Sequence, residues 1–331
     1  MQDQKDSANI LKQCRYELQK RIVGQSEMLD ELVSSLVSGG HVLLEGPPGL
    51  AKTRSAIALA ELSGLSFKRI QFTPDLLPAD LTGTMVWEQG KNTFAVHKGP
   101  LFANIILADE VNRAPAKVQS ALLEAMEEKQ VSIGGESYPL PSPFIVLATQ
   151  NPIEQEGTYS LPEAELDRFF IKLKIPYPKL EEEIDIIKTQ SDKTANNQPL
   201  EPLLQGKTLA GLQAAWQAVQ VDDKLAEYIA NLVLATRPEN KNMNSTSTGL
   251  AKNSFYRYIK LGASPRASLC LHIFARVKAL FDNRNFVIPD DIKAAAHPVL
   301  RHRIIRSWEA EAEGADADSL IDILLNHVPL P

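Results

Sequence analysis

Short apolar segments alternate with longer segments of helical periodicity through the first 190 residues of the chain. Runs of four to eight apolar residues between turn-forming residues are typical of buried strands. The predicted strands of this kind are residues 41–44, 104–110 and 144–149, and residues 67–72 and 169–175 are also expected to be strands. Apolar residues three and four positions apart predict helices. The predicted helices are residues 10–21, 28–37, 53–64, 115–129 and 179–190. Strands that alternate with helices predict an α/β core around a parallel sheet.

Two segments interrupt this alternation with the period of two that is typical of exposed strands. Residues 84–97 and 130–140 alternate polar and apolar positions around short polar turns, so we expect two hairpins. Insertions in an α/β domain often carry binding function. A solvated hairpin without a binding role fits the same pattern.

The pattern changes in the last 120 or so residues, where only helical periodicity is found. The expected helices are residues 209–219, 223–236, 266–281 and 290–296. Residues 191–202 are rich in Asn and Gln and are typical of a linker, and the polar residues 237–261 are expected to form a long, mobile loop. We therefore expect an α/β core with hairpin insertions over residues 1–195 and a helical domain over residues 196–331.

Composition places the chain among soluble globular proteins. It has 331 residues, 44% of them hydrophobic, and a formal net charge of −6, which weighs against a dedicated nucleic-acid binder. Cys14 and Cys270 lie far apart without metal-like spacing, which favours a reducing compartment. The polar N-terminus does not resemble a signal peptide, and no apolar run is long enough to cross a bilayer. We expect a cytoplasmic protein that binds neither nucleic acid nor membranes.

The sequence GPPGLAKT follows the first predicted strand and leads into a helix. Its residues are Gly46, Pro47, Pro48, Gly49, Leu50, Ala51, Lys52 and Thr53. A glycine loop between a strand and a helix lets several backbone N–H groups converge on phosphate oxygens, and the helix N-terminus adds its positive end. In such a P-loop, Lys52 reaches the terminal phosphates and the Thr53 hydroxyl ligates Mg²⁺. The pattern predicts a nucleoside triphosphate site.

Ala51 departs from the general P-loop pattern, which has Gly directly before the Lys. Alanine fits this position only if the backbone there is helix-like and not left-handed. A turn between a strand and a helix that binds no phosphate is the alternative interpretation of the whole loop.

Asp109 and Glu110 end an apolar strand, at the sheet edge where open α/β sheets bind ligands. Asp109 is the candidate to hold Mg²⁺ through its water shell, and Glu110 to orient and polarise the attacking water. The alternative is that both acids cap the next helix. That helix is expected to begin only near Pro115, so capping does not explain both acids.

Two further segments are candidates for nucleotide contacts. Asn151 follows another buried strand, where its amide can hydrogen-bond a phosphate and the attacking water, although Asn before Pro also forms turns. Val23 and Gly24 lie in an Ile-Val-Gly-Gln segment before the P-loop. This segment could form a wall for an adenine ring, or it could simply break a helix.

Two arginines complete the set of candidates. Arg168 lies at a helix–strand junction, where an internal salt bridge with Glu165 or Asp167 is the alternative to a catalytic role. Arg266 follows Ser264 and Pro265, an N-cap and a first-turn proline. A cation in the first turn opposes the helix dipole, so we expect an anionic partner, either a nucleotide phosphate or an ordinary carboxylate.

Five motifs together resemble the MoxR branch of the AAA+ ATPases. They are GPPGLAKT, ILADEVNRAP, LATQNP, LPEAELDRF and GASPRA, in this order, and the resemblance spans residues 20–310. It implies a P-loop αβα core with a five-stranded parallel sheet and an all-helical AAA+ lid. It also implies that Ala51 is the usual form in this branch.

The resemblance also implies roles and partners. Asn151 matches sensor 1, Arg266 matches sensor 2, and Arg168 matches the arginine finger offered to a neighbour's nucleotide. Relatives form hexamers with ATP at the subunit interfaces, and the two hairpins commonly face the ring pore. MoxR relatives are regarded as chaperone-like and often act with separate proteins that carry von Willebrand factor A domains.

These observations lead to one main functional hypothesis and two alternatives. The main hypothesis is a Mg²⁺-dependent ATPase that remodels or activates a protein partner. The first alternative is a nucleotide-gated binding module in which hydrolysis only resets the ATP state. A DNA translocase is the second, and no basic tract in the sequence supports it.

Overall fold

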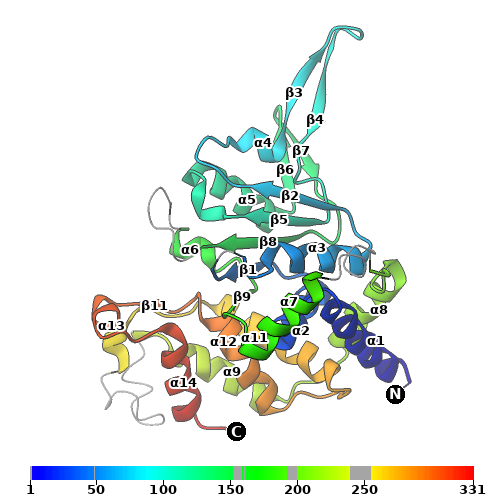
Figure 1. Ribbon diagram of the computed structural model, residues 1–331. Coiled ribbons are helices and arrows are strands. Elements are labelled where there is room, and N and C mark those ends of the chain that lie inside the picture. The colour runs from blue at the N-terminus through cyan, green and yellow to red at the C-terminus, as the bar shows by residue number, and fades with distance from the viewer. Residues whose placement is uncertain (1, 48, 152–158, 160, 192–199, 239–254) are drawn as a thin grey trace. The chain divides into compact units, whose positions relative to one another are not determined.

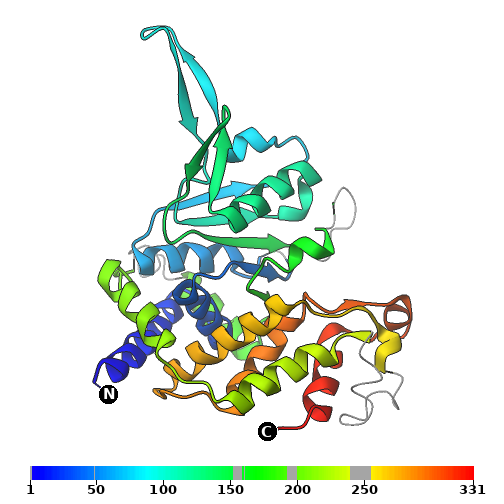
Figure 2. The same cartoon turned by 180° about the vertical axis from the view of Figure 1, so that it is seen from behind.

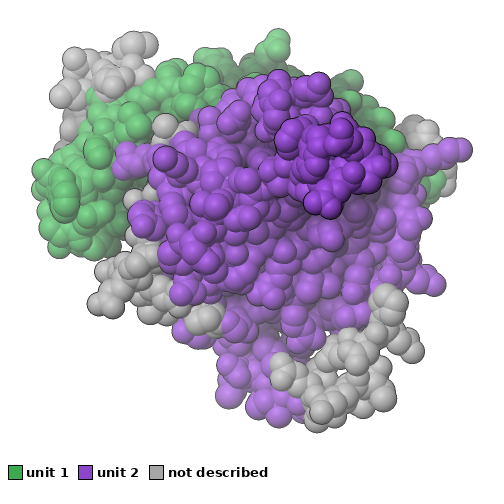
Figure 3. Space-filling view, turned by 90° about the horizontal axis from the view of Figure 1, so that it is seen from above, with its two compact units in different colours: residues 1–12, 169–172, 210–331 green, residues 13–168, 173–209 purple. Residues whose placement is uncertain are grey.

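The computed structural model describes residues 2–47, 49–151, 159, 161–191, 200–238 and 255–331. The chain folds into two compact units, which Figure 3 distinguishes by colour. The core unit comprises residues 13–168 and 173–209, and the helical unit comprises residues 1–12, 169–172 and 210–331. The expected boundary at residues 195–196 lies outside the described residues and stays a prediction.

A five-stranded sheet forms the centre of the core unit, with the strand order β2-β5-β8-β1-β9. The strands are β1 (Val42–Glu45), β2 (Phe67–Gln71), β5 (Ile105–Asp109), β8 (Ile145–Gln150) and β9 (Ile171–Lys174). The pairs β2–β5, β5–β8 and β1–β8 are parallel. β5 is buried along its whole length, which explains its unbroken apolar run. The predicted α/β core is confirmed.

Strand register brings the candidate residues to one edge of this sheet. Gln71 pairs with Asp109, and Glu45 pairs with Gln150, so the carboxyl ends of four strands meet there. Helices α3 (Lys52–Ser63) and α5 (Ala116–Glu128) lie on opposite faces of the sheet (Figures 1 and 2). Right-handed crossovers require this, because the chain crosses the sheet in opposite directions after β1 and after β5.

The other helices largely follow the apolar periodicity. They are α1 (Gln2–Gln19), α2 (Ser26–Ser38), α4 (Pro78–Thr82), the 3-10 turn η1 (Val111–Arg113), α6 (Glu163–Leu166), α7 (Leu180–Ser191) and α8 (Gly206–Gln217). α1 begins well before residue 10, where the prediction placed its start. Leu11, Cys14 and Leu18 form its buried face, and burial raises the pKa of the Cys14 thiol to about 12.

The two predicted hairpins are confirmed. β3 (Gly83–Glu88) pairs with β4 (Thr93–Lys98), and β6 (Gln130–Ile133) pairs with β7 (Glu136–Pro139). The first hairpin extends away from the sheet (Figure 1). Trp87 faces Phe94 across it, edge to face, with 5.0 Å between ring centroids, and both side chains are about half exposed.

The helical unit corrects the expectation of helices alone, because it includes a short antiparallel pair, β10 (Ile259–Leu261) with β11 (Ile305–Arg306). Its other elements are α9 (Asp223–Ala235), the 3-10 turn η5 (Phe255–Tyr258), α11 (Pro265–Phe281), α12 (Pro289–Leu300), α13 (Trp308–Ala312) and α14 (Ala317–His327). Most of the loop expected over residues 237–261 lies outside the described residues.

Candidate functional site

The P-loop joins the end of β1 to the start of α3. The N–H of Gly46 donates to the carbonyl of Gln150 across a distance of 3.4 Å, which fixes the loop to β8. A Cβ at Gly46 would lie 2.9 Å from the carbonyl oxygen of Ile175, so only glycine fits there. Lys52 is the first residue of α3 and is buried, and its ammonium donates to the carbonyls of Gly46 at 2.6 Å and Gln150 at 3.3 Å. The ammonium group of Lys52 is therefore hydrogen-bonded to backbone carbonyls of the loop and of β8. Pro47 and Gly49 belong to the same loop, and Pro48 lies outside the described residues.

Ala51 has a left-handed backbone, with φ 57° and ψ 12°. This corrects the expectation that alanine is tolerated here only in a helix-like conformation. The left-handed conformation turns the loop directly into the first turn of α3, for which Ala51 is the N-cap. An L-residue with a Cβ is strained by roughly 1–2 kcal/mol in this region. Ala51 therefore has the backbone conformation that a glycine would adopt at this position.

Asp109 lies at the end of β5 and is buried, and both of its carboxylate oxygens accept hydrogen bonds. Oδ1 accepts from the Thr149 hydroxyl at 2.7 Å. Oδ2 accepts from the Thr53 hydroxyl at 3.3 Å and from two nitrogens of Arg69, at 3.0 and 2.7 Å. The two residues predicted to hold Mg²⁺, Thr53 and Asp109, are therefore direct neighbours.

Glu110 follows with a left-handed backbone, φ 57° and ψ 51°. Its N–H donates to the Thr149 hydroxyl at 2.8 Å. Its Oε2 accepts from Gln71 at 2.8 Å and from Arg113 at 2.9 Å. Glu110 is the N-cap position of the 3-10 turn η1, but its side chain makes no capping hydrogen bond there, and α5 begins only at Ala116.

Asn151, Arg168 and Arg266, the three candidates that follow in the chain, lie at different elements of the fold. Asn151 follows β8 and is buried, at the same edge of the sheet as Asp109. Arg168 pairs with Glu127, Nε to Oε2 at 2.6 Å, and not with the neighbouring acids that the sequence suggested. Arg266 belongs to the helical unit and the P-loop to the core unit, and the contact of Arg266 with a nucleotide stays a prediction.

The N-cap prediction for α11 is confirmed. The Ser264 hydroxyl accepts the N–H of Arg266 at 3.1 Å, and Pro265 is the first helical residue. This geometry places Arg266 in the first turn, as its sequence position indicated.

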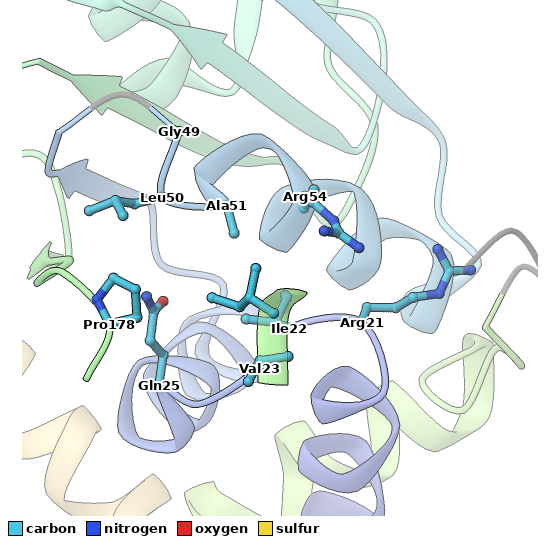
Figure 4. A pocket seen from close by; sticks show the side chains of 10 residues that line it. Arg21, Ile22, Val23, Gln25, Gly49, Leu50, Ala51, Arg54 and Pro178 are labelled. Atoms are coloured by element: carbon cyan, nitrogen blue, oxygen red, sulfur yellow. The ribbon is translucent and has the colours of Figure 1, made fainter. Parts of the chain in front are cut away.

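A cavity of about 120 Å³ lies beside the P-loop within the core unit (Figure 4). Its apolar lining consists of Ile22, Val23, Leu50, Ala51, Pro178 and Ile186, and Arg21 and Arg54 add two guanidinium groups. Gly24 precedes α2 with φ 69°, and a Cβ there would lie 2.1 Å from a carboxylate oxygen of Glu182. The Ile-Val-Gly-Gln segment thus separates α1 from α2, and its residues Ile22, Val23 and Gln25 also line this cavity. Its contact with adenine stays a prediction.

The residues present fit a magnesium nucleotide. Thr53 and Asp109 offer hard oxygen ligands, which Mg²⁺ prefers. Among the described residues no group of three or more His, Cys, Asp or Glu side chains could hold a metal ion. Mg²⁺ is usually bound by one or two carboxylates together with the substrate phosphates.

Sequence reasoning missed several residues of this site. Thr149 has no exposed surface at the end of an otherwise apolar strand, and a buried hydroxyl at a strand end is a signal that could have been used. Arg69 and Gln71 lie on β2 and reach Asp109 and Glu110 only because β2 is next to β5. That strand order cannot be read from a single sequence.

The structure describes no helix with the length and apolarity that a bilayer-spanning segment requires.

Two family models match the chain. The ATPase family associated with various cellular activities (AAA) matches residues 41–171, and the AAA lid domain matches residues 256–323.

Relatives match almost the whole chain. Chaperone MoxR1 of Mycobacterium tuberculosis is 44% identical over 324 residues, covering 98% of this chain and 83% of the relative. Protein MoxR of Paracoccus denitrificans is 32% identical over 325 residues, covering 94% and 93%. A crystal structure of a candidate ATPase from Cytophaga hutchinsonii has a TM-score of 0.90 and 46% identity, and it covers 100% of this chain and 97% of its own.

Proposed function

The chain belongs to the MoxR family of AAA+ ATPases, and on that premise we propose that it hydrolyses ATP with Mg²⁺ to remodel or activate a protein partner. The AAA and lid family models and the chaperone name of a relative support the ATPase and the chaperone-like parts of this proposal. The magnesium requirement rests on the site, and the remodelling of a partner rests on the chaperone name of a relative.

One observation carries the proposal: the Thr53 hydroxyl and the Asp109 carboxylate lie 3.3 Å apart, next to the helix that begins with Lys52. A metal ligand pair, a cationic side chain and a helix N-terminus then converge at one sheet edge. The alternative interpretation, a turn that binds no phosphate, does not explain why these groups lie together.

The chain's own side chains supply the steps of hydrolysis. Bound Mg²⁺ would offset negative charge on the phosphate oxygens. Lys52 would leave the Gly46 and Gln150 carbonyls and contact the terminal phosphates. Glu110 would accept the proton of the attacking water, while Asn151 would hold that water and the terminal phosphate by hydrogen bonds.

Assembly would supply the remaining charge. Arg266 in the same chain and Arg168 of a neighbouring subunit would stabilise the negative charge that develops as the terminal phosphate leaves. The expected assembly is a homo-hexamer with ATP at the subunit interfaces. A separate protein, a client or one with a von Willebrand factor A domain, is the expected partner, and the chaperone name of the mycobacterial relative supports a protein client.

Two variants test the proposal by calorimetry with ATP and by phosphate release. Lys52→Ala should abolish ATP binding, because it removes the cation at the phosphates. Glu110→Gln should keep ATP binding and lower hydrolysis by roughly 10²- to 10⁴-fold, the usual contribution of a general base. Lys68→Gln, which removes an exposed cation of β2, is the matched control and should change neither property.

A wild-type protein that binds neither ATP nor ADP overturns the proposal. Glu110→Gln also separates hydrolysis-driven remodelling from nucleotide gating. If the ATP-bound variant fully supports the partner's activity, the ATP state alone is the active form.

A further inference from the structure

Asp109 already has a cation on the oxygen that faces the metal-binding hydroxyl. Oδ2, which accepts from Thr53, is also the oxygen that receives both nitrogens of Arg69, at 2.7 and 3.0 Å. Oδ1 is held separately by Thr149. The guanidinium therefore pairs with the oxygen through which Asp109 and Thr53 meet.

The position of Arg69 follows from the sheet. Gln71 pairs with Asp109 and Arg69 with Leu107 in the parallel register of β2 and β5. Residues two apart in a strand share a face, so Arg69 and Gln71 project to the same side of the sheet. Arg69 also donates to the Gln71 amide oxygen at 3.2 Å, which orients its guanidinium.

We propose that Arg69 is a positioning residue that neutralises Asp109 in the nucleotide-free chain and competes with Mg²⁺ for this carboxylate. This inference rests on the proposed function, because it assumes that Asp109 takes part in binding the metal of a nucleotide. Arg69 thus sets how strongly the metal contributes to nucleotide binding.

Burial explains why Asp109 needs a cation when no metal is bound. The Asp109 side chain is 9% exposed, and a buried charge without a partner is costly. The Arg69 side chain is 50% exposed, so it can turn out into solvent and lose only an ion pair that is already screened by water. Thr149 remains on Oδ1 in either case and keeps the carboxylate in place.

The experiment measures how much Mg²⁺ tightens nucleotide binding. The affinity for a fluorescent N-methylanthraniloyl-ADP is measured with saturating Mg²⁺ and with EDTA. The ratio compared among variants is the dissociation constant in EDTA divided by the dissociation constant in Mg²⁺. Arg69→Gln should raise this ratio about three- to tenfold over wild type, the range expected when a half-exposed ion pair no longer competes. Arg69→Lys should raise it less, because a lysine keeps the charge but loses the two-nitrogen contact.

Lys68→Gln is the control for net charge. It removes one positive charge from the neighbouring position of β2, on the other face of the strand, and should leave the ratio at the wild-type value. Thermal melting establishes that each variant is folded. If Arg69→Gln does not fold, the Arg69→Lys ratio decides.

The outcomes separate the two proposals. A wild-type chain that binds no nucleotide under either condition overturns the proposed function, and Arg69 loses its role with it. A wild-type ratio above one that stays equal in Arg69→Gln, or that rises equally in Lys68→Gln, overturns only the role of Arg69.

Discussion

Three non-glycine residues around the P-loop have left-handed backbones: Gln25 before α2, Ala51 before α3 and Glu110 after β5. Strained residues of this kind persist where the surrounding structure holds them, and they cluster at functional sites. Each lies at a junction where the chain has to turn sharply toward the candidate site. The strained backbone at these turns therefore serves to orient the side chains of Lys52 and Glu110.

At the residue scale, the strain at Ala51 gives a stability prediction. Ala51→Gly should raise the free energy of unfolding by about 1 kcal/mol, because glycine adopts φ 57° without a Cβ clash. Ala121→Gly, inside α5, is the matched control and should lower it by about 1 kcal/mol, since glycine is a poor helix former. Urea denaturation of both variants measures the two signs. A loss of stability in Ala51→Gly would mean that Ala51 is not strained.

Single residues also show how far the sequence could predict the site. Lys52, Thr53, Asp109 and Glu110 carry chemical signatures at strand ends, so their proximity could be predicted. The left-handed conformation of Ala51 and the ion pair of Arg168 with Glu127 could not. A sequence names residue types, whereas backbone angles and long-range partners depend on how the chain packs.

At the scale of elements, His41 joins three parts of the core unit. It precedes β1, its Nδ1 accepts the N–H of Val146 in β8 at 3.0 Å, and its Nε2 donates to the carbonyl of Met126 in α5 at 3.2 Å. The ring is buried, and burial lowers the pKa of His41 to about 4. Only the neutral ring can accept from Val146, so protonation breaks this link.

The core unit should consequently lose stability in acid. A histidine pKa that is lower in the folded than in the unfolded chain contributes stability above about pH 6.5, and this contribution is lost as the pH falls through 4. In His41→Gln this contribution is absent, because an amide does not titrate. The free energy of unfolding of the wild type minus that of the variant should fall by about 3 kcal/mol from pH 7 to pH 4. Urea denaturation at several pH values measures it, and a difference that does not change with pH contradicts the prediction.

Element prediction succeeded where apolar periodicity was strong and failed where it was weak. β1, β5 and β8 are buried apolar runs, and they were predicted. α4, α13 and β11 span five, five and two residues, too few to establish a period. α1 extends to Gln2 through polar residues, where helix propensity and not an apolar face continues the helix.

At the scale of the whole molecule, the Arg168–Glu127 pair bears on assembly. If Arg168 serves a neighbouring subunit, it has to leave Glu127, to which it is bound at 2.6 Å. Arg168→Ala should keep nucleotide affinity but lose the increase in hydrolysis on assembly, which an arginine finger can raise by roughly 10³-fold or more. Glu127→Gln keeps the arginine and should retain the increase. Turnover measured against protein concentration gives both results, and equal turnover of Arg168→Ala and wild type removes Arg168 from the mechanism.

The burial of the two cysteines determines how their thiols react with reagents in solution. Both Cys14 and Cys270 are buried, and at neutral pH the Cys14 thiol is almost entirely protonated. Oxidants and alkylating reagents attack the thiolate, so the Cys14 sulfur is shielded by its protonation as well as by its position. Cys14 should therefore stay reduced in oxidising and reducing media alike, and a cysteine introduced at an exposed position such as Gly90 would react with a maleimide first.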